Sequence, residues 1–397
     1  MRSKLDDSGI FNTVTRGETE EAANAIANLS PTDARAVIQT LDRNGQLDRL
    51  ATYLERHGDS DEGRAIQRNF ARAMGRRLDG QGLATVAESM RGAGEGSRAA
   101  FISGVNATAT VDTRVDLVQA LAGKTTDNTP SRREIDTFFG GSSHTSFRSD
   151  GDAASVAGVI SSLRGEDAQR AFGQLSDAQR AAVFDGATNV RDVGMTTSGG
   201  GMGPASYSNW ESGDPEGFAR LSRAIGSMPD RELRAQYLDE SLAALGRASE
   251  IRGRDRAAMA SSVLGQLDSE TVAGLRPDNM AVLADGLVHS QNGPRAALRT
   301  IEGFDASPNR DALVRTMFLK TPERAFTNDR ALAGRFARGL AAAEGGDDPA
   351  ATAQRAQRLE RALSTENGRA LLTDSDIPGQ ARLWAARATM DGSDAVR

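Results

Sequence analysis

The chain has 397 residues, of which 38% are hydrophobic and 26% are charged, and its formal net charge is −6. This apolar content is enough for packed cores, and the length allows two or three ordinary domains or one extended array of helical repeats. Arginines alternate with Asp and Glu along the chain, so it lacks the concentrated basic surface that general nucleic-acid binding needs.

Side chains that bind metals or form disulfides are scarce. The chain has no cysteine and three histidines, which are His57, His144 and His289. Disulfides and thiolate chemistry are therefore excluded, and a structural zinc site is not expected. No motif points to a cofactor, so we expect neither a metal nor a cofactor.

The sequence predicts no membrane span, because no stretch approaches the about 20 apolar residues that cross a bilayer. The first residues, MRSKLDDSGIF, lack the apolar core of a secretory signal peptide. We therefore expect a protein that is cytoplasmic in the producing cell and that leaves it only through a specialised secretion or injection system, which needs no such signal.

Helix start signals recur along the chain. They pair a capping side chain with a following proline, which lacks the N–H that the first helical turn would leave unpaired. The pairs are Ser30-Pro31, Thr129-Pro130, Asp214-Pro215, Ser307-Pro308, Thr321-Pro322 and Asp348-Pro349. Ser176 and Gln179 add a capping-box pattern. So many start signals predict many short helices.

Between these signals, apolar residues recur with helical spacing, as in Leu83, Val86 and Met90. Alternation with a period of two is not found over any useful length. We therefore predict an all-α fold: an array of short antiparallel helices that forms a degenerate helical repeat or superhelix, with two long loop insertions.

One Arg-led segment recurs. Residues 98–105 (RAAFISGV) match residues 180–187 (RAAVFDGA), and looser copies begin at Arg35, Arg234 and Arg310. The irregular spacing excludes a tetratricopeptide or ankyrin array. Two interpretations stay open: a degenerate repeat with insertions, or unrelated Ala/Arg helices that resemble one another.

The two insertions are Gly-, Ser- and Thr-rich segments at residues 124–152 and 188–214. They divide the chain into an N-terminal helical region (1–125), a loop-rich central helical region (126–214) and a C-terminal helical region (215–397).

These insertions carry the candidate chemistry. His144 lies in a segment of Gly, Ser and Thr, where a general base can be placed, and Asp136 and Glu211 are carboxylates that such a base needs. The alternative is a solvated loop histidine. The glycine-rich segment 199–203 is followed by no lysine before Lys320, so we expect no phosphate-binding loop there.

Tyr207 and Trp210 lie in the second insertion among polar residues. Aromatic side chains in such surroundings anchor partner proteins, and we assign both as candidate partner-binding residues. The alternative is that they cover the core of the inserted segment.

Three Ala/Arg-rich segments are LSPTDARAVIQTLDRNGQLDRLATYL (29–54), VDTRVDLVQALAGKT (111–125) and LSDAQRAAVFDGA (175–187). In style they resemble the helical regions of large secreted or injected toxins and effectors of GC-rich bacteria. The resemblance implies a delivery, chaperoning or scaffold role beside a toxic activity, and it transfers no functional residue.

These observations favour a non-enzymatic helical scaffold that binds another protein, as a secreted or injected bacterial effector or as a component of its delivery. Two alternatives stay open. One is a helical hydrolase-type toxin with its site on the central loops, and the other is a phage or particle structural protein that assembles into an oligomer. The sequence does not predict the oligomeric state.

Overall fold

The computed structural model describes residues 15–58, 60–93, 96–123, 131–136, 141–147, 151–188, 191–197, 207–248, 251, 253–289, 293–322, 325–326, 329–344, 348–366, 368–369 and 379–391. Backbone packing divides the chain into a first unit, Met1–Pro229, and a second unit, Asp230–Arg397. The three regions predicted from composition follow the insertions rather than this packing, and they stay a prediction.

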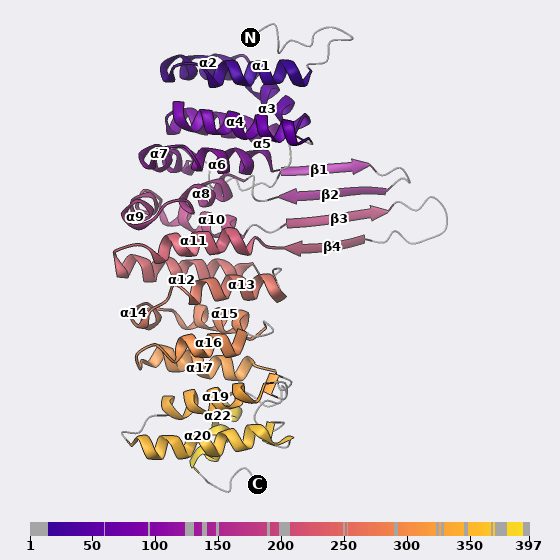
Figure 1. Ribbon diagram of the computed structural model, residues 1–397. Coiled ribbons are helices and arrows are strands. Elements are labelled where there is room, and N and C mark those ends of the chain that lie inside the picture. Colours follow the sequence, from indigo (N-terminus) through magenta and orange to yellow (C-terminus); the bar gives the residue numbers. More distant parts are fainter. Residues whose placement is uncertain are drawn as a thin grey trace. The chain divides into compact units, whose positions relative to one another are not determined.

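The first unit contains α1 (Arg16–Ala27), α2 (Pro31–Arg43), α3 (Gln46–Arg56), α4 (Asp61–Arg77), α5 (Gly80–Ala93), α6 (Ser97–Asn106), α7 (Val111–Ala122), α8 (Asp152–Ile160), α9 (Gly165–Gly173), α10 (Asp177–Thr188) and α11 (Pro215–Gly226). Helices two apart in the chain pack together, as α3 does with α5, α4 with α6, α5 with α7 and α8 with α10 (Figure 1). Each helix thus buries its apolar face against the next layer, which is how stacked helical arrays form a continuous core.

The second unit contains α12 (Arg231–Arg247), α13 (Gly253–Leu264), α14 (Ser269–Ala273), α15 (Pro277–Val288), α16 (Gly293–Ile301), α17 (Pro308–Lys320), α19 (Arg330–Ala343), α20 (Pro349–Ser364) and α22 (Gly379–Asp391). The same packing of alternate helices recurs here, in the pairs α13 with α15, α15 with α17 and α17 with α19. The prediction of an all-α array of short packed helices is confirmed. No helix in the described part of the chain has both the length and the apolar character that crossing a bilayer requires.

The predicted caps begin many of these helices. Ser30, Asp214, Ser307 and Asp348 are N-caps whose side chains accept backbone N–H bonds, each with proline next in the chain. Ser176 and Gln179 form the predicted reciprocal bonds at the start of α10. Thr321 is an exception, because it ends α17 and its hydroxyl donates to the carbonyl of Met317 at 2.7 Å. Thr129-Pro130 lies outside the described residues.

Small residues bring the helices close together. A Cβ atom at Gly104 of α6 would lie 2.5 Å from the Cβ of Ala71 in α4, and one at Gly286 of α15 would lie 2.5 Å from the Cβ of Ala260 in α13. Both distances are far shorter than a van der Waals contact, so these helices approach to a separation that only glycine allows. The alanine- and glycine-rich composition is therefore used for close packing in both units.

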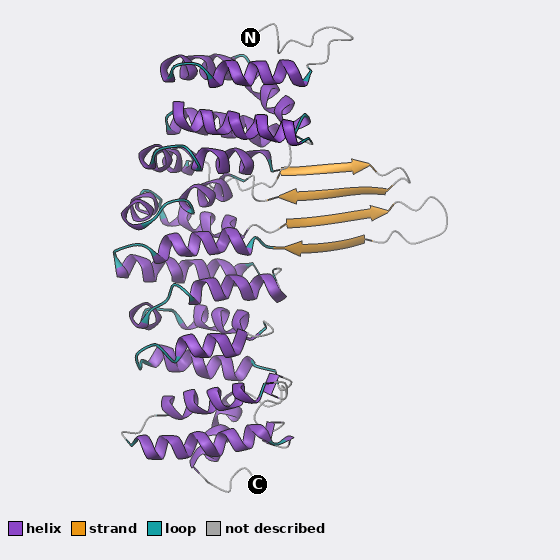
Figure 2. Cartoon of the chain, in the orientation of Figure 1, coloured by secondary structure: helices purple, strands orange, loops and turns teal. Residues whose placement is uncertain are grey.

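The two insertions differ from the prediction of loops. The first forms strands β1 (Ser131–Asp136) and β2 (Gly141–Phe147), and the second forms β3 (Arg191–Thr197) and β4 (Tyr207–Ser212). The four strands pair antiparallel in the order β1-β2-β3-β4 (Figure 2). Sequence periodicity missed them because each strand is short and made mostly of polar residues, and because the central pairing joins segments far apart in the chain.

Candidate functional site

The recurrent Arg-led segments place their arginines at helix starts. Arg35 pairs with Asp79 at 2.7 Å just before α5, and Arg234 pairs with Asp268, the N-cap of α14, at 2.6 Å. Arg98 pairs with Asp152, the first residue of α8, also at 2.6 Å. Three of the five copies thus share one structural role, in which a guanidinium holds the start of a later helix.

The other two copies act locally. Arg180 pairs with Asp177 in the first turn of its own helix at 2.6 Å, and Arg310 pairs with its neighbour Asp311 at 2.6 Å. These arginines therefore explain the recurrence of the segment through helix capping and anchoring, rather than through a reactive site.

The pair of Arg98 and Asp152 forms a deeply buried charge cluster in the first unit. The Arg98 side chain is 0% exposed and the Asp152 side chain 1% exposed. Arg91 lies 3.5 Å from the second oxygen of Asp152, and Glu88 lies 3.8 Å from Arg98. Burial raises the pKa of Asp152, although the hydrogen bond and the charge of Arg98 oppose this shift. Because Asp152 is the last residue of the first insertion, the cluster anchors the end of that insertion to α5 and α6.

The second insertion is closed at its base. The N–H of Asp214 donates to the carbonyl of Thr188 at 3.1 Å, which joins the end of α10 to the start of α11. The side chain of Asp214 then accepts from the N–H of Gly217 at 2.8 Å and caps α11. The chain therefore leaves and re-enters the helical array at one point.

A groove lies beside the end of the first insertion and beside both ends of the second insertion. It has a volume of 440 Å³ and is lined by α6, α8, α10 and α11. Its surface is made mostly of Ala, Ser and Gly, with Asn106, Asp214 and Arg220 as the larger polar residues. The side-chain N–H of Asn106 donates to the carbonyl of Gly158 at 3.0 Å, whereas its buried oxygen Oδ1 has no hydrogen-bond partner among the described residues. Small residues leave room for the backbone of a bound segment to approach closely.

The register of the sheet relates the predicted site residues. His144 is opposite Glu134 in β1 and Gly194 in β3. Asp136 is opposite Ser142, two residues from His144 along β2.

Successive residues of a strand alternate between the two faces of a sheet. In β4, Tyr207 is opposite Thr196 and Glu211 is opposite Asp192, and both of these β3 positions share the face of Gly194. The register therefore puts all four polar candidates on one face. They are Asp136, His144, Tyr207 and Glu211.

Trp210 is on the opposite face, because it is opposite Val193. The same face holds most of the large apolar positions of the sheet, which are Ile135, Phe147, Val193, Met195 and Trp210. Val193, Met195 and Trp210 lie in the second insertion, and the pairing of β2 with β3 adds Ile135 and Phe147 from the first insertion to the same face. The register therefore separates the two predicted partner-binding residues, and it places Tyr207 with the polar candidates.

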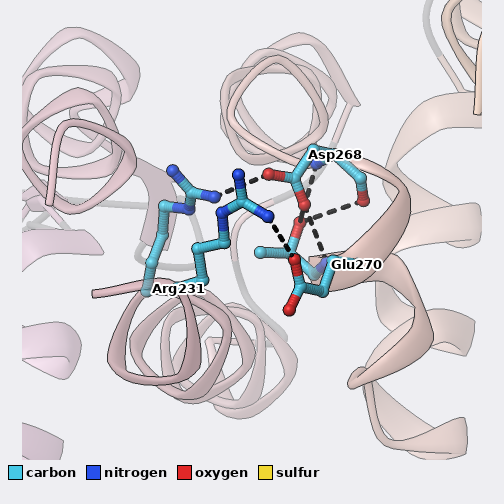
Figure 3. A network of polar contacts seen from close by, with 5 residues as sticks. Arg231, Asp268 and Glu270 are labelled. Carbon is cyan, nitrogen blue, oxygen red and sulfur yellow. Dashed lines mark hydrogen bonds and ion pairs between the residues drawn. The ribbon is translucent and has the colours of Figure 1, made fainter. Parts of the chain in front are cut away.

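A polar network in the second unit resembles a site but has a structural role (Figure 3). Arg231 pairs with Glu270 at 2.8 Å, and Arg234 pairs with Asp268. The pKa of Asp268 lies below its ordinary value: burial opposes the shift, but hydrogen bonds from the backbone and side chain of Thr271 and the nearby guanidinium groups outweigh it. The carboxylate oxygens of Asp268 thus accept the bonds that cap α14 and the bond from Arg234.

The described residues contain no group of three or more His, Asp or Glu side chains placed to hold a metal ion. His57 and His289 are the C-caps of α3 and α15, and Nδ1 of His289 lies 2.7 Å from the carbonyl oxygen of Asp285. The segment 199–203 lies outside the described residues. No family model, no curated protein and no solved structure matches this chain.

Proposed function

We propose that this protein is a non-enzymatic helical scaffold that binds another protein, and that its receiving surface combines the groove at the base of the insertions with the apolar face of the sheet around Trp210. The observation that carries the proposal is this apolar face. Five large apolar positions coincide on one side of a sheet whose other side is polar. Trp210 is opposite Val193, and Met195 follows Val193 on the same face; an apolar cluster bordered by polar residues is typical of protein–protein interaction sites.

The groove supports the same proposal. It lies beside the start of α8 and the end of α10, where the two insertions meet the helical array. A bound segment that contacts the sheet is therefore within reach of a concave surface lined by small residues. Stacked helices present such concave surfaces to partners in other helical-repeat proteins. The role as a secreted or injected effector, or as a component of its delivery, rests on the resemblance in the Ala/Arg-rich segments.

The two faces of β4 supply a matched test. Trp210→Ala removes the aromatic residue of the apolar face, and Tyr207→Ala removes the aromatic residue of the polar face on the same strand. We expect chemical cross-linking and mass spectrometry in lysates of the producing cell and of candidate target cells to recover a partner with wild type and Tyr207→Ala. We expect Trp210→Ala to recover at least tenfold less of this partner, because a central aromatic anchor contributes roughly 2 kcal/mol or more to the binding free energy.

Equal recovery of the same proteins by wild type and Trp210→Ala would refute the assignment of the apolar face. Recovery of no protein above background by wild type would count against the scaffold itself. Both variants should keep the helical circular-dichroism spectrum and unfolding midpoint of wild type, since they lie outside the packed helices.

A hydrolase-type toxin is the second candidate, because the register brings Asp136, His144 and Glu211 to one face. A base, a carboxylate and a substrate-facing surface are requirements of such chemistry. His144→Ala and Glu211→Ala in an expression-toxicity assay distinguish it: loss of toxicity in both variants, with Trp210→Ala unchanged, would favour the enzyme over the scaffold. An oligomeric particle protein remains the third candidate, and light scattering at high concentration tests it.

A further inference from the structure

The second unit contains a separate groove between α16, α17 and α19. Its volume is 290 Å³, which corresponds to about ten water molecules at ~30 Å³ each. Leu298, Ile301 and Val314 form an apolar floor, and Gly339 and Ala342 border it. Filling this groove with apolar side chains releases that water, which is the main driving force for association of apolar surfaces.

Three arginines border the same groove: Arg310, Arg335 and Arg338. Arg335 forms an ion pair with Glu302, and Arg310 forms one with Asp311. These pairings hold two guanidinium groups in place beside the floor. Together the five charged side chains leave an excess of one positive charge at the groove.

Arg338 supplies that excess. It is exposed, and no ion pair or hydrogen bond of its side chain is found within the described residues. Arg335, Arg338 and Ala342 follow one another at helical spacing on α19, so they form one stripe along the groove. A ligand that lies along this stripe meets positive charge at one end and small residues at the other.

We infer that this groove binds an acidic amphipathic segment of a partner protein, with aliphatic side chains on the floor and a carboxylate on Arg338. The charge complementarity selects an acidic segment over a neutral or basic one. The apolar floor selects an amphipathic segment over a uniformly charged one. This site lies in a different unit from the surface in the proposed function, and it does not depend on that proposal.

The test uses a synthetic fluorescein-labelled peptide of about 18 residues, or five helical turns. Leu residues occupy one face and Glu residues flank them. We expect full-length protein to bind it saturably, with a Kd of about 10–100 μM in fluorescence anisotropy. A peptide with Lys in place of Glu, and a scrambled peptide of the same composition, should bind at least tenfold more weakly.

Two variants locate the site. Arg338→Glu exchanges attraction for repulsion, and we expect it to weaken binding about tenfold. Ala342→Trp fills the groove from an exposed position without removing a buried group, and we expect it to abolish saturation. Arg361→Glu, at an exposed arginine of α20 in the same unit, is the matched control and should bind as wild type does.

Equal binding of the scrambled peptide overturns the inference, because it would indicate charge attraction alone. Unchanged affinity in both Arg338→Glu and Ala342→Trp also overturns it, as does the absence of saturable binding to wild type at roughly 1 mM peptide. Stoichiometric displacement of the peptide by dodecanoate, with a tighter Kd that also depends on Arg338, would identify a small amphiphile as the occupant instead of a protein segment. Thermal unfolding of each variant separates a binding defect from a folding defect.

Discussion

Removal of the Asp152 carboxylate tests how the first insertion is anchored. In Asp152→Ala, the buried guanidinium of Arg98 loses the carboxylate at 2.6 Å and keeps its longer ion pair with Glu88 at 3.8 Å. Removing one member of a buried ion pair typically costs about 3–5 kcal/mol, and because the ion pair with Glu88 remains we expect a cost at the lower end of this range. This is a large part of the about 5–15 kcal/mol that stabilises a folded domain.

Asp152→Asn is the informative comparison. The amide keeps a side-chain oxygen that accepts the hydrogen bond from Arg98, and it removes only the negative charge. Because burial raises the pKa of Asp152, its ionised form is disfavoured in the folded state. We therefore expect Asp152→Asn to cost about 1–2 kcal/mol, well below the cost of Asp152→Ala.

The raised pKa also predicts a pH dependence. Between the ordinary aspartate value of about 4 and the higher value in the folded protein, the folded state binds a proton that the unfolded state has released. Wild type therefore loses stability as pH rises through this window, and Asp152→Asn does not. The unfolding free energy of wild type minus that of Asp152→Asn should fall as pH rises from about 4 through the raised pKa of Asp152, and then become constant.

Urea unfolding followed by far-UV circular dichroism measures these free energies. The reasoning about a buried pair is refuted if Asp152→Ala lies within about 1 kcal/mol of wild type, since that is the range of an exposed ion pair. It is also refuted if the difference between wild type and Asp152→Asn rises with pH, which would mean that the folded state favours the ionised carboxylate.

The remaining predictions concern helix contacts and caps in both units. Gly104→Ala should destabilise the first unit by about 1–3 kcal/mol, because the new Cβ would lie 2.5 Å from the Cβ of Ala71. Gly92→Ala is the control: nothing lies within 4 Å of its new Cβ, so it should be neutral or stabilising by helix propensity. A higher unfolding temperature in both variants would contradict the close approach of α4 and α6. Asp268→Ala should destabilise the second unit by about 1–2 kcal/mol through loss of the α14 cap, and Glu270→Ala, at an exposed pair, by less than about 0.5 kcal/mol. Because the pKa of Asp268 is lowered, its contribution to the free energy of unfolding is present above about pH 4 and should disappear as pH falls through the lowered pKa. A loss of that stability when the pH is raised would contradict the role of Asp268 as a charged cap.

Local chemistry made most of the fold predictable. Capping residues such as Ser30 and Asp214 define where helices begin, since their oxygen atoms pair with N–H groups that no helical carbonyl reaches. Leu83, Val86 and Met90, read as one helical stripe, are all buried on α5. These signals depend on residues a few positions apart, so they can be read without the tertiary structure.

Pairing between residues far apart in the chain determined the buried charge cluster and the sheet, which the sequence did not predict. The sequence shows Arg98 as the first residue of a recurrent segment, but its partner Asp152 is 54 residues away, and only the packing of α6 against α8 joins them. In the same way, the pairing of β2 with β3 across three intervening helices brings Ile135 and Phe147 to the face of Trp210. Contacts between distant residues depend on how helices and strands pack together. Spacing along the chain therefore predicted the individual helices, whereas the tertiary structure determined which distant residues lie together.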